Sequence, residues 1–196
     1  MAVNGFRIAE RTRKTKETDV SIKINLDGNG EGAIGTGMGF FDHMLDLFRV
    51  HGGFDVDISC KGDINVDYHH SVEDVAIVLG ECVRTALGDK KGIRRYACAV
   101  IPMDEALAQV ALDVSGRPFL VFNAHLSGKS GEFDLELVEE FMRAFSYNAG
   151  ATLHINLVYG SNGHHIAEAI FKAFARALSD AVKIVGDKIP SSKGIL

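Results

Sequence analysis

The amino-acid sequence predicts an α+β fold made of two copies of a βββαβα unit, each a sheet covered by helices on one face in a two-layer arrangement. Three observations support this prediction. The order of apolar runs in residues 1–90 is repeated in residues 91–196. The pattern HHxxE occurs at 69–73 and again at 164–168. A chain of 196 residues, 46% hydrophobic and 24% charged, suits one compact unit with a sizeable core.

The first unit is expected in residues 1–90. Alternating apolar residues indicate strands, and apolar residues at a spacing of three or four indicate helices. On these criteria the elements are strands near 5–10, 18–26 and 31–35, a helix at 38–51, a strand at 54–60 and a helix at 69–87.

The second unit is expected in residues 91–196, after a GDKKG turn at 88–92. Its elements follow the same order: strands at 93–101, 106–115 and 118–125, a helix at 134–149, a strand at 151–159 and a long amphipathic helix at 164–185. Aligning the two HHxxE motifs, with a slightly longer loop in the first unit, puts His43 opposite Glu140 and Gly53 opposite Gly150.

Charge and composition exclude several classes of function. The net charge is −5 with both signs interspersed, so neither nucleic acid nor an anionic membrane is expected as a partner. No apolar run approaches the ~20 residues that span a bilayer, and the first residues lack a secretory signal, so a cytoplasmic location is expected. Three widely spaced cysteines, Cys60, Cys82 and Cys98, suit reduced and mostly buried thiols rather than disulfides.

The two HHxxE motifs are the strongest chemical signal in the sequence. On a helix, a glutamate three or four residues after a histidine shares its face. Adjacent histidines lie about 100° apart around the helix, so the two histidines of one pair suit two different metal ions. A single histidine pair is more often structural, but a doubled motif, each with a ligand-type residue on the preceding helix, favours a metal centre.

Eight residues are therefore candidate ligands for two octahedral ions: His43, His69, His70, Glu73, Glu140, His164, His165 and Glu168. Imidazole and carboxylate donors without thiolate favour Mn²⁺ or a similar ion over structural zinc.

The sequence closely resembles the imidazoleglycerol-phosphate dehydratase family over nearly its whole length. The resemblance rests on an ordered set of motifs: TKET at 15–18, FFDHML at 40–45, DYHHSVED at 67–74, GIRRY at 92–96, PMDEAL at 102–107, SGRP at 115–118, NGHHIAEAIFKAFARAL at 162–178 and PSSKG at 190–194. It implies the duplicated βββαβα fold of the ribosomal protein S5 domain 2-like type. It also implies two Mn²⁺ ions per active site and a homo-oligomer of 24 chains, built from trimers, with active sites at subunit interfaces.

The resemblance implies dehydration of D-erythro-imidazole glycerol phosphate to imidazole acetol phosphate in L-histidine biosynthesis. In this scheme the substrate's imidazolate bridges the two metals, loss of hydroxide gives a diazafulvene, and an enol tautomerises to the product. Glu17 is then expected to move a proton, although without the resemblance the sequence indicates only an exposed glutamate in a strand. Glu73 and Glu168 are alternatives if a ligand doubles as a base.

One residue departs from the family pattern, because many members carry histidine at the position of Glu140. Glutamate also binds Mn²⁺, so Glu140 is kept as a candidate ligand; the alternative is a solvated carboxylate beside Glu139.

The substrate's phosphate requires cations and hydroxyl donors. By resemblance these are Arg95, Arg117, Lys172 and the C-terminal residues Ser191, Ser192 and Lys193, with His51 as a further substrate contact. Composition alone would allow a frayed tail, an ordinary helical Glu168–Lys172 pair and a structural His51.

Two other functions compete with the dehydratase. A metal-buffering or metal-sensing module would use the same histidines but not the phosphate-binding residues. A dinuclear hydrolase would release inorganic phosphate from a small phosphoester.

Overall fold

A computed structural model describes residues 7–196 of the chain. The first half contains β1 (Ile8–Lys14), β2 (Thr18–Asn25), β3 (Ile34–Gly35), α1 (Gly39–Gly52), β4 (Asp55–Gly62) and α2 (His69–Leu87). Its four strands form one sheet in the order β1-β2-β4-β3. Strand β2 is antiparallel to both of its neighbours, and β3 runs parallel to β4.

The second half repeats this topology. It contains β5 (Tyr96–Met103), β6 (Ala106–Asp113), β7 (Phe119–Asn123), α3 (Leu137–Ala149), β10 (Thr152–Tyr159) and α4 (Gly163–Val182). The sheet order is β5-β6-β10-β7, with β6 antiparallel to both neighbours and β7 parallel to β10. The predicted α+β fold of two βββαβα units is confirmed.

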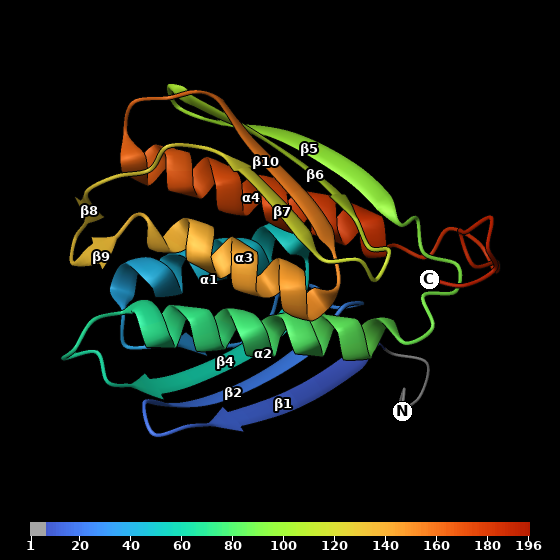
Figure 1. The fold of residues 1–196 in the computed structure, drawn as a ribbon, viewed down its shortest axis with the longest axis horizontal. Helices are drawn as coiled ribbons and strands as arrows, with labels where there is room; N and C mark the ends of the chain where they lie inside the picture. The colour runs from blue at the N-terminus through green and yellow to red at the C-terminus, as the bar shows by residue number, and fades with distance from the viewer. Residues whose placement is uncertain (1–6) are drawn as a thin grey trace.

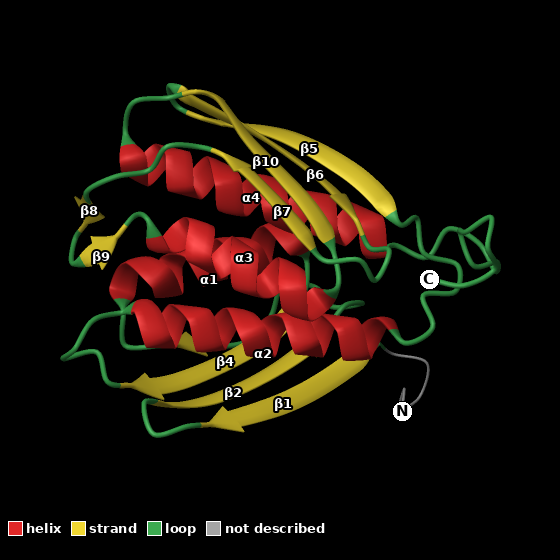
Figure 2. Cartoon of the chain, in the orientation of Figure 1, coloured by secondary structure: helices red, strands yellow, loops and turns green. Residues whose placement is uncertain are grey.

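The two halves pack with their helices face to face, so the sheets form the two outer layers (Figures 1 and 2). Helix α2 covers β1 and β2, and α4 covers β5 and β6. Across the middle, α1 packs on α4 and α2 packs on α3. Each helix pair therefore combines one helix from each half of the chain.

A core of aromatic side chains joins the halves. Helix α1 buries Phe41, Met44, Leu45 and Phe48, a spacing that gives one apolar face. The ring of Phe48 stacks on Phe174 of α4 with centroids 5.5 Å apart. Because the core crosses between the halves, it fixes how α1 and α4 meet.

Equivalent glycines end the two shorter helices. Gly53 after α1 and Gly150 after α3 both adopt the left-handed conformation, with φ of 68° and 66°. A residue without a Cβ takes this conformation without strain, so it closes a helix and turns the chain into the next strand. The alignment that placed His43 opposite Glu140 is thereby consistent with the fold.

Some element boundaries differ from those expected. The first strand runs to Lys14 rather than ending near residue 10, because its polar half forms a sheet edge and shows no apolar alternation; residues 5 and 6 lie outside the described part. Ile93 lies outside β5 and makes an isolated bridge to Ile184. The bridge coincides with extended backbone at Lys183, where α4 ends before the expected residue 185.

A small hairpin of β8 (Lys129–Ser130) and β9 (Phe133–Asp134) was not predicted. It occupies the start of the region expected as helix 134–149, so α3 begins only at Leu137.

Within residues 7–196, none of the helices has the length and apolar character needed to cross a bilayer. All three cysteines are free thiols; Cys60 and Cys82 are buried, whereas Cys98 is exposed.

Candidate metal centre and substrate site

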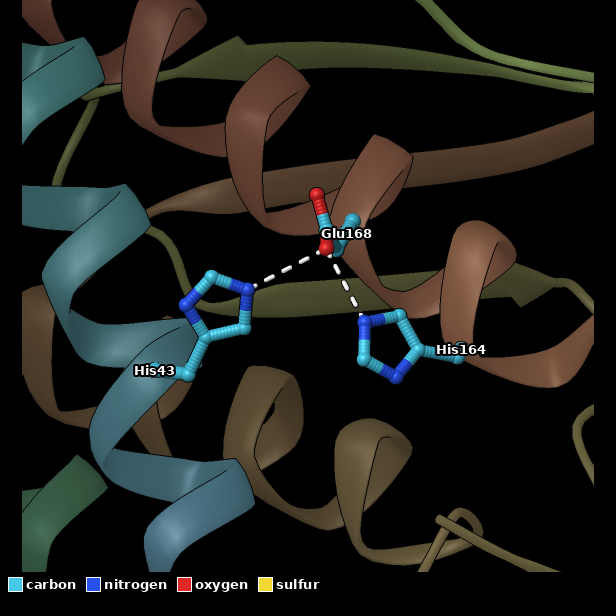
Figure 3. A group of neighbouring side chains, drawn as sticks. All are labelled: His43, His164 and Glu168. Atoms are coloured by element: carbon cyan, nitrogen blue, oxygen red, sulfur yellow. Dashed lines mark hydrogen bonds and ion pairs between the residues drawn. The ribbon is translucent and has the colours of Figure 1, made fainter.

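Three of the candidate ligands converge between α1 and α4. Figure 3 shows His43 and His164 both directed at the carboxylate of Glu168. The Nε2 atoms of His43 and His164 lie 3.1 Å and 3.0 Å from Glu168 Oε1. Glu168 is only 6% exposed, so its charge sits inside the helix layer. We call these three residues the His43 cluster.

The start of α4 explains the position of two cluster members. Asn162 caps the helix: its side-chain oxygen accepts hydrogen bonds from the backbone N–H groups of His164 and His165. His164 therefore lies in the first turn, and Glu168 follows one turn later on the same face.

The hairpin β8–β9 supplies a partner for His164. Ser130 Oγ lies 3.1 Å from His164 Nδ1. In the metal-free chain Nε2–H donates to Glu168 and Nδ1 accepts from the Ser130 hydroxyl. If the proton moves to Nδ1 and is donated to Ser130, the Nε2 lone pair faces the cluster and is available to an ion.

Lys172 holds the opposite oxygen of Glu168, with Nζ 2.5 Å from Oε2, and also lies 3.2 Å from the sulfur of Met103. Burial disfavours the charged carboxylate, but hydrogen bonds from Lys172, His43 and His164 outweigh it and lower the pKa of Glu168 to about 2. Glu168 is therefore an anion at neutral pH.

The geometry of the His43 cluster fits a divalent ion. The three ligand atoms lie within 4.8 Å of one another. Adjacent ligands of an octahedral ion are about 3 Å apart when the metal–ligand bonds are about 2.1 Å long, close to the two distances to Glu168. Two imidazoles and a carboxylate are the donor types that suit Mn²⁺ and related ions.

The second histidine of each motif points elsewhere. His70 Nδ1 lies 3.2 Å from Asp63 and 3.9 Å from Glu17. His165 Nδ1 lies 2.7 Å from Glu105 Oε2. The hydrogen bonds to Asp63 and Glu105, respectively, raise the pKa of His70 and of His165. The rings of His164 and His165 lie nearly perpendicular to each other, and their contacts with Glu168 and Glu105 show that one pair faces two places, as the helical spacing predicts.

The corresponding residues on α2 and α3 are less tightly gathered. His69 is exposed at the first position of α2, and Glu73 and Glu140 are half-buried. In the part of the chain that the structure describes, the His43 cluster is the only group of three such side chains within 4.8 Å.

Arg95 and the C-terminal residues meet at the far end of the molecule. The guanidinium of Arg95 binds Asp113 at 2.8 Å, donates to the carbonyl of Pro190 at 2.7 Å and stacks on Tyr96. Arg117 lies 3.6 Å from Asp113 and its side chain is 68% exposed. Ser191 accepts the backbone N–H of Lys193, whose side chain is exposed together with that of Ser192.

These basic residues lie far from the His43 cluster of the same chain. The backbone N–H of Arg95 donates to the carbonyl of Ala181, in the last turn of α4, whereas Glu168 lies in the second turn. The separation along the helix is about 20 Å at about 1.5 Å per residue. In Figure 1 the C-terminal segment and the start of α4 stand at opposite ends of the long axis.

His51, in the last turn of α1, lies near α4 on the same side as Lys172. Burial, with the charges of Lys172 and Arg176, lowers its pKa, so it is neutral at pH 7. His154 lies on the outward face of β10, away from the His43 cluster.

The residues that orient the histidines were missed in the sequence. Ser130 lies in the two-residue strand β8 and Asp63 in the loop after β4, and neither belongs to a recognisable motif. Glu105 belongs to the PMDEAL segment, and its place directly before the second strand of its half, like that of Glu17, was an available signal.

The chain is similar to proteins of one known family. A family model described as imidazoleglycerol-phosphate dehydratase matches residues 36–178. The enzymes of that name from Azorhizobium caulinodans and Acetivibrio thermocellus are each 58% identical, over 97% and 95% of this chain and 99% and 97% of their own lengths.

Two solved structures are similar as well. The Staphylococcus aureus imidazoleglycerol-phosphate dehydratase has a TM-score of 0.81 and 48% identity, covering 89% of this chain and 97% of its own. The Pyrococcus furiosus enzyme, in complex with (S)-C348, has a TM-score of 0.83 and 35% identity, covering 95% and 100%. Because of this fold, the His43 cluster and these relatives, the chain belongs to the imidazoleglycerol-phosphate dehydratase family, whose members are hydro-lyases that dehydrate imidazole glycerol phosphate in histidine biosynthesis.

Proposed function

We propose that the chain dehydrates D-erythro-imidazole glycerol phosphate to imidazole acetol phosphate with two Mn²⁺ ions per active site, in the cytoplasm and within a large homo-oligomer. The observation that carries the proposal is the convergence of His43, His164 and Glu168 at distances suited to one octahedral ion.

The duplication assigns the remaining ligands. His43, His164 and Glu168 would hold one ion, and Glu140, His69 and Glu73 occupy the matching positions for a second. His70 and His165 point away from these positions, toward the surface of their own chain. They are therefore suited to reach ions held by neighbouring chains.

The separation of the two functional ends requires more than one chain per active site. The cluster lies near the start of α4, and Arg95 with the C-terminal residues lies beyond its end. A substrate as small as imidazole glycerol phosphate cannot span about 20 Å of helix. The metal-binding end of one chain must therefore meet the phosphate-binding end of another, as in the expected 24-chain assembly.

The outer face of the second sheet supports this assembly. Exposed apolar side chains on β5 and β10, including Tyr96, Val100 and Val158, stand at 50–56% exposure. A hollow of about 470 Å³ beside them is lined by Tyr96, Cys98, Asp113 and His154, among others, and adjoins Arg95 and Arg117. An apolar face next to the phosphate-binding residues suits contact with a second copy of this chain.

The metal ions would act as Lewis acids that hold the substrate's imidazole ring and make its side chain reactive. The reaction removes a proton from the middle carbon of the glycerol chain, and the hydroxyl on the carbon attached to the imidazole ring leaves as water. The resulting enol takes a proton on carbon to give the ketone.

Among the candidate bases, the surroundings favour Glu17. Glu168 is held by Lys172 and has a pKa of about 2, so it is a weak base. The side chain of Glu17 is 55% exposed, and its one ion-pair contact within residues 7–196 is with His70, at 3.9 Å. Glu17 is thus free to accept a proton from a bound substrate.

The phosphate would be held by Arg117, Ser191, Ser192 and Lys193, together with Arg95 and, from the metal-binding side, Lys172; His51 would contact the substrate. Three of the five N–H donors of Arg95 already bind Asp113 and Pro190, which anchors the C-terminal segment. The remaining donors, and the exposed guanidinium of Arg117, are available for charge-assisted bonds to the phosphate.

The proposal is tested by titrating metal-free protein with Mn²⁺ and then assaying turnover of imidazole glycerol phosphate. We expect close to two Mn²⁺ per chain, formation of the acetol phosphate only after Mn²⁺ is added, and no release of inorganic phosphate. Equal turnover of metal-free protein would contradict the proposal. Phosphate release would indicate the hydrolase, and Mn²⁺ binding without turnover would indicate the metal-buffering module.

A further inference from the structure

We infer that Glu105 is a positioning residue that fixes the ring of His165 as a metal ligand, and that its counterpart in the first half, Glu17, is released from this task by Asp63. The inference rests on the proposed function, because it assigns the device that orients one of the proposed ligands.

Glu105 is held at both of its carboxylate oxygens. Oε1 accepts the backbone N–H groups of Asn162 at 2.7 Å and Ser161 at 3.2 Å, and lies 3.4 Å from the Ser161 hydroxyl. Oε2 lies 2.7 Å from His165 Nδ1. A single side chain therefore ties the β5–β6 turn to the start of α4 and to the ring of His165.

The contact determines which nitrogen of His165 can bind a metal. A carboxylate only accepts hydrogen bonds, so Nδ1 must carry the proton. The neutral ring then presents its lone pair at Nε2, which lies 3.7 Å from Asp104 Oδ2. Hydrogen bonding of the other ring nitrogen to a carboxylate is the common way in which proteins orient a histidine ligand.

The first half contains the same arrangement with a different division of tasks. Glu17 directly precedes β2 as Glu105 directly precedes β6, and the sheet register agrees: Asn25 pairs with Asp55 as Asp113 pairs with Thr152. Glu17 nevertheless stays 3.9 Å from His70, which is held by Asp63 at 3.2 Å instead.

The two turn carboxylates therefore have different roles. Glu105 has its oxygens occupied by His165 and by the loop before α4, so it is not available to accept a proton from carbon. Among the residues that the structure describes, Glu17 has no comparable set of donors, since its nearest histidine is already held by Asp63. The duplicated fold thus keeps one carboxylate to position a ligand and the other to move a proton.

The test compares Glu105→Ala, Glu105→Gln and Ser161→Ala. Mn²⁺ alone is titrated into each folded, metal-free variant, and bound metal is followed by electron paramagnetic resonance. We expect Glu105→Ala to weaken Mn²⁺ binding about 10- to 100-fold, the usual effect of removing such a partner. In Glu105→Gln the single amide oxygen cannot accept both from Nδ1 and from the N–H groups of Ser161 and Asn162, so affinity should also fall, by less than in Glu105→Ala. Ser161→Ala, which keeps the contact to His165, should bind as the unaltered chain does.

Turnover separates the two carboxylates. Glu105→Ala should regain turnover when excess Mn²⁺ is supplied, whereas Glu17→Ala should bind Mn²⁺ normally and stay inactive at any Mn²⁺ concentration. If Glu105→Ala folds and binds Mn²⁺ as tightly as the unaltered chain, the inference is wrong. Should Glu105→Ala fail to fold, Glu105→Gln is used alone: we expect weakened Mn²⁺ binding and turnover restored by excess Mn²⁺, and either unchanged affinity or turnover lost despite excess Mn²⁺ overturns the inference. If the unaltered chain itself binds no Mn²⁺, it is the proposed function that fails.

Discussion

At the scale of single residues, the behaviour of Glu168 follows from its neighbours. A carboxylate that is almost fully buried is stable only if its charge is compensated, and Lys172 with two imidazoles provides that compensation. The same three contacts keep it charged and directed at the position of an ion. Metal binding and the stability of the metal-free chain are therefore coupled through one side chain.

This coupling predicts an acid-sensitive window. Because the folded-state pKa of Glu168, about 2, is below its ordinary value of 4.5, its contribution to stability is complete above pH 4.5 and is lost as the pH falls toward 2. Lys172→Met removes a hydrogen bond that lowers this pKa. We expect the metal-free variant to be less stable at pH 6 and to lose less stability between pH 4.5 and 2.

Urea unfolding midpoints at several pH values measure this difference. Lys61→Met, which replaces an exposed lysine on β4, is the control and should follow the unaltered chain. Parallel pH profiles for Lys172→Met and the unaltered chain would show that Lys172 does not stabilise the charged carboxylate.

A second residue-scale prediction concerns the C-terminal segment. Lys193→Ala removes an ammonium proposed to bind the substrate's phosphate, and a bond of this kind contributes about 1.5–3 kcal/mol. We therefore expect KM to rise roughly 10- to 100-fold with a smaller change in kcat. Lys188→Ala, an exposed lysine of the same segment, is the matched control. An unchanged KM in Lys193→Ala would remove the segment from the phosphate site.

At the scale of elements, the sequence predicted the helices that occur in both halves of the chain and missed the hairpin that occurs in one half. Apolar spacing indicated α1, α2, α3 and α4 because each buries one continuous face. The hairpin β8–β9 has only two residues in each strand and no counterpart in the described part of the first half. Neither periodicity nor duplication could reveal it, although it contacts the His43 cluster through Ser130.

The same limit applied to the site. The doubled HHxxE motif identified ligand candidates, because their spacing is a local property of one helix. Which of them meet depends on α1 packing against α4, a contact between distant parts of the chain. Asp63 comes from a loop whose direction is set by the sheet, so its contact could not be deduced from spacing, whereas for Glu105 the matching position of Glu17 was the one available signal.

The hairpin gives a prediction of its own. Ser130→Ala removes the hydroxyl beside His164 Nδ1 and leaves the ring free to rotate. We expect Mn²⁺ affinity to fall about tenfold with little change in thermal stability. Ser127→Ala, an exposed serine just before the hairpin, should have no effect. Isothermal titration calorimetry with Mn²⁺ measures both variants, and equal affinities would exclude a role for Ser130.

At the scale of the whole molecule, the two sheets form opposite outer faces and the functional groups lie at opposite ends (Figure 1). On the proposed function, a single chain would carry an incomplete site at each end. The proposed assembly would complete both kinds of site and would cover the apolar face of the second sheet beside Arg95.

Cysteine reactivity reports on that face. Cys98 is exposed in the hollow of the second sheet, whereas Cys60 and Cys82 are buried, and burial raises the pKa of Cys82 to about 12. With a thiol-alkylating reagent, we expect Cys98 to react rapidly in the dissociated chain and slowly in the assembly. Mass spectrometry after timed alkylation identifies the modified residue. Rapid reaction of Cys98 in the assembly would show that this face is not covered.

The most direct test of a site shared between chains is complementation. Two differently tagged variants are co-expressed, one with Glu168→Gln at the metal-binding end and the other with Arg117→Ala and Lys193→Ala at the phosphate-binding end. Assemblies that carry both tags are purified and assayed with Mn²⁺.

If each active site combines opposite ends of two chains, about one pairing in four is intact in an equal mixture. The mixed assembly should then recover about a quarter of the unaltered activity, although each variant alone is nearly inactive. A mixed assembly no more active than its separate variants would mean that each chain supplies its own metal ligands and phosphate-binding residues, contrary to the geometry of α4.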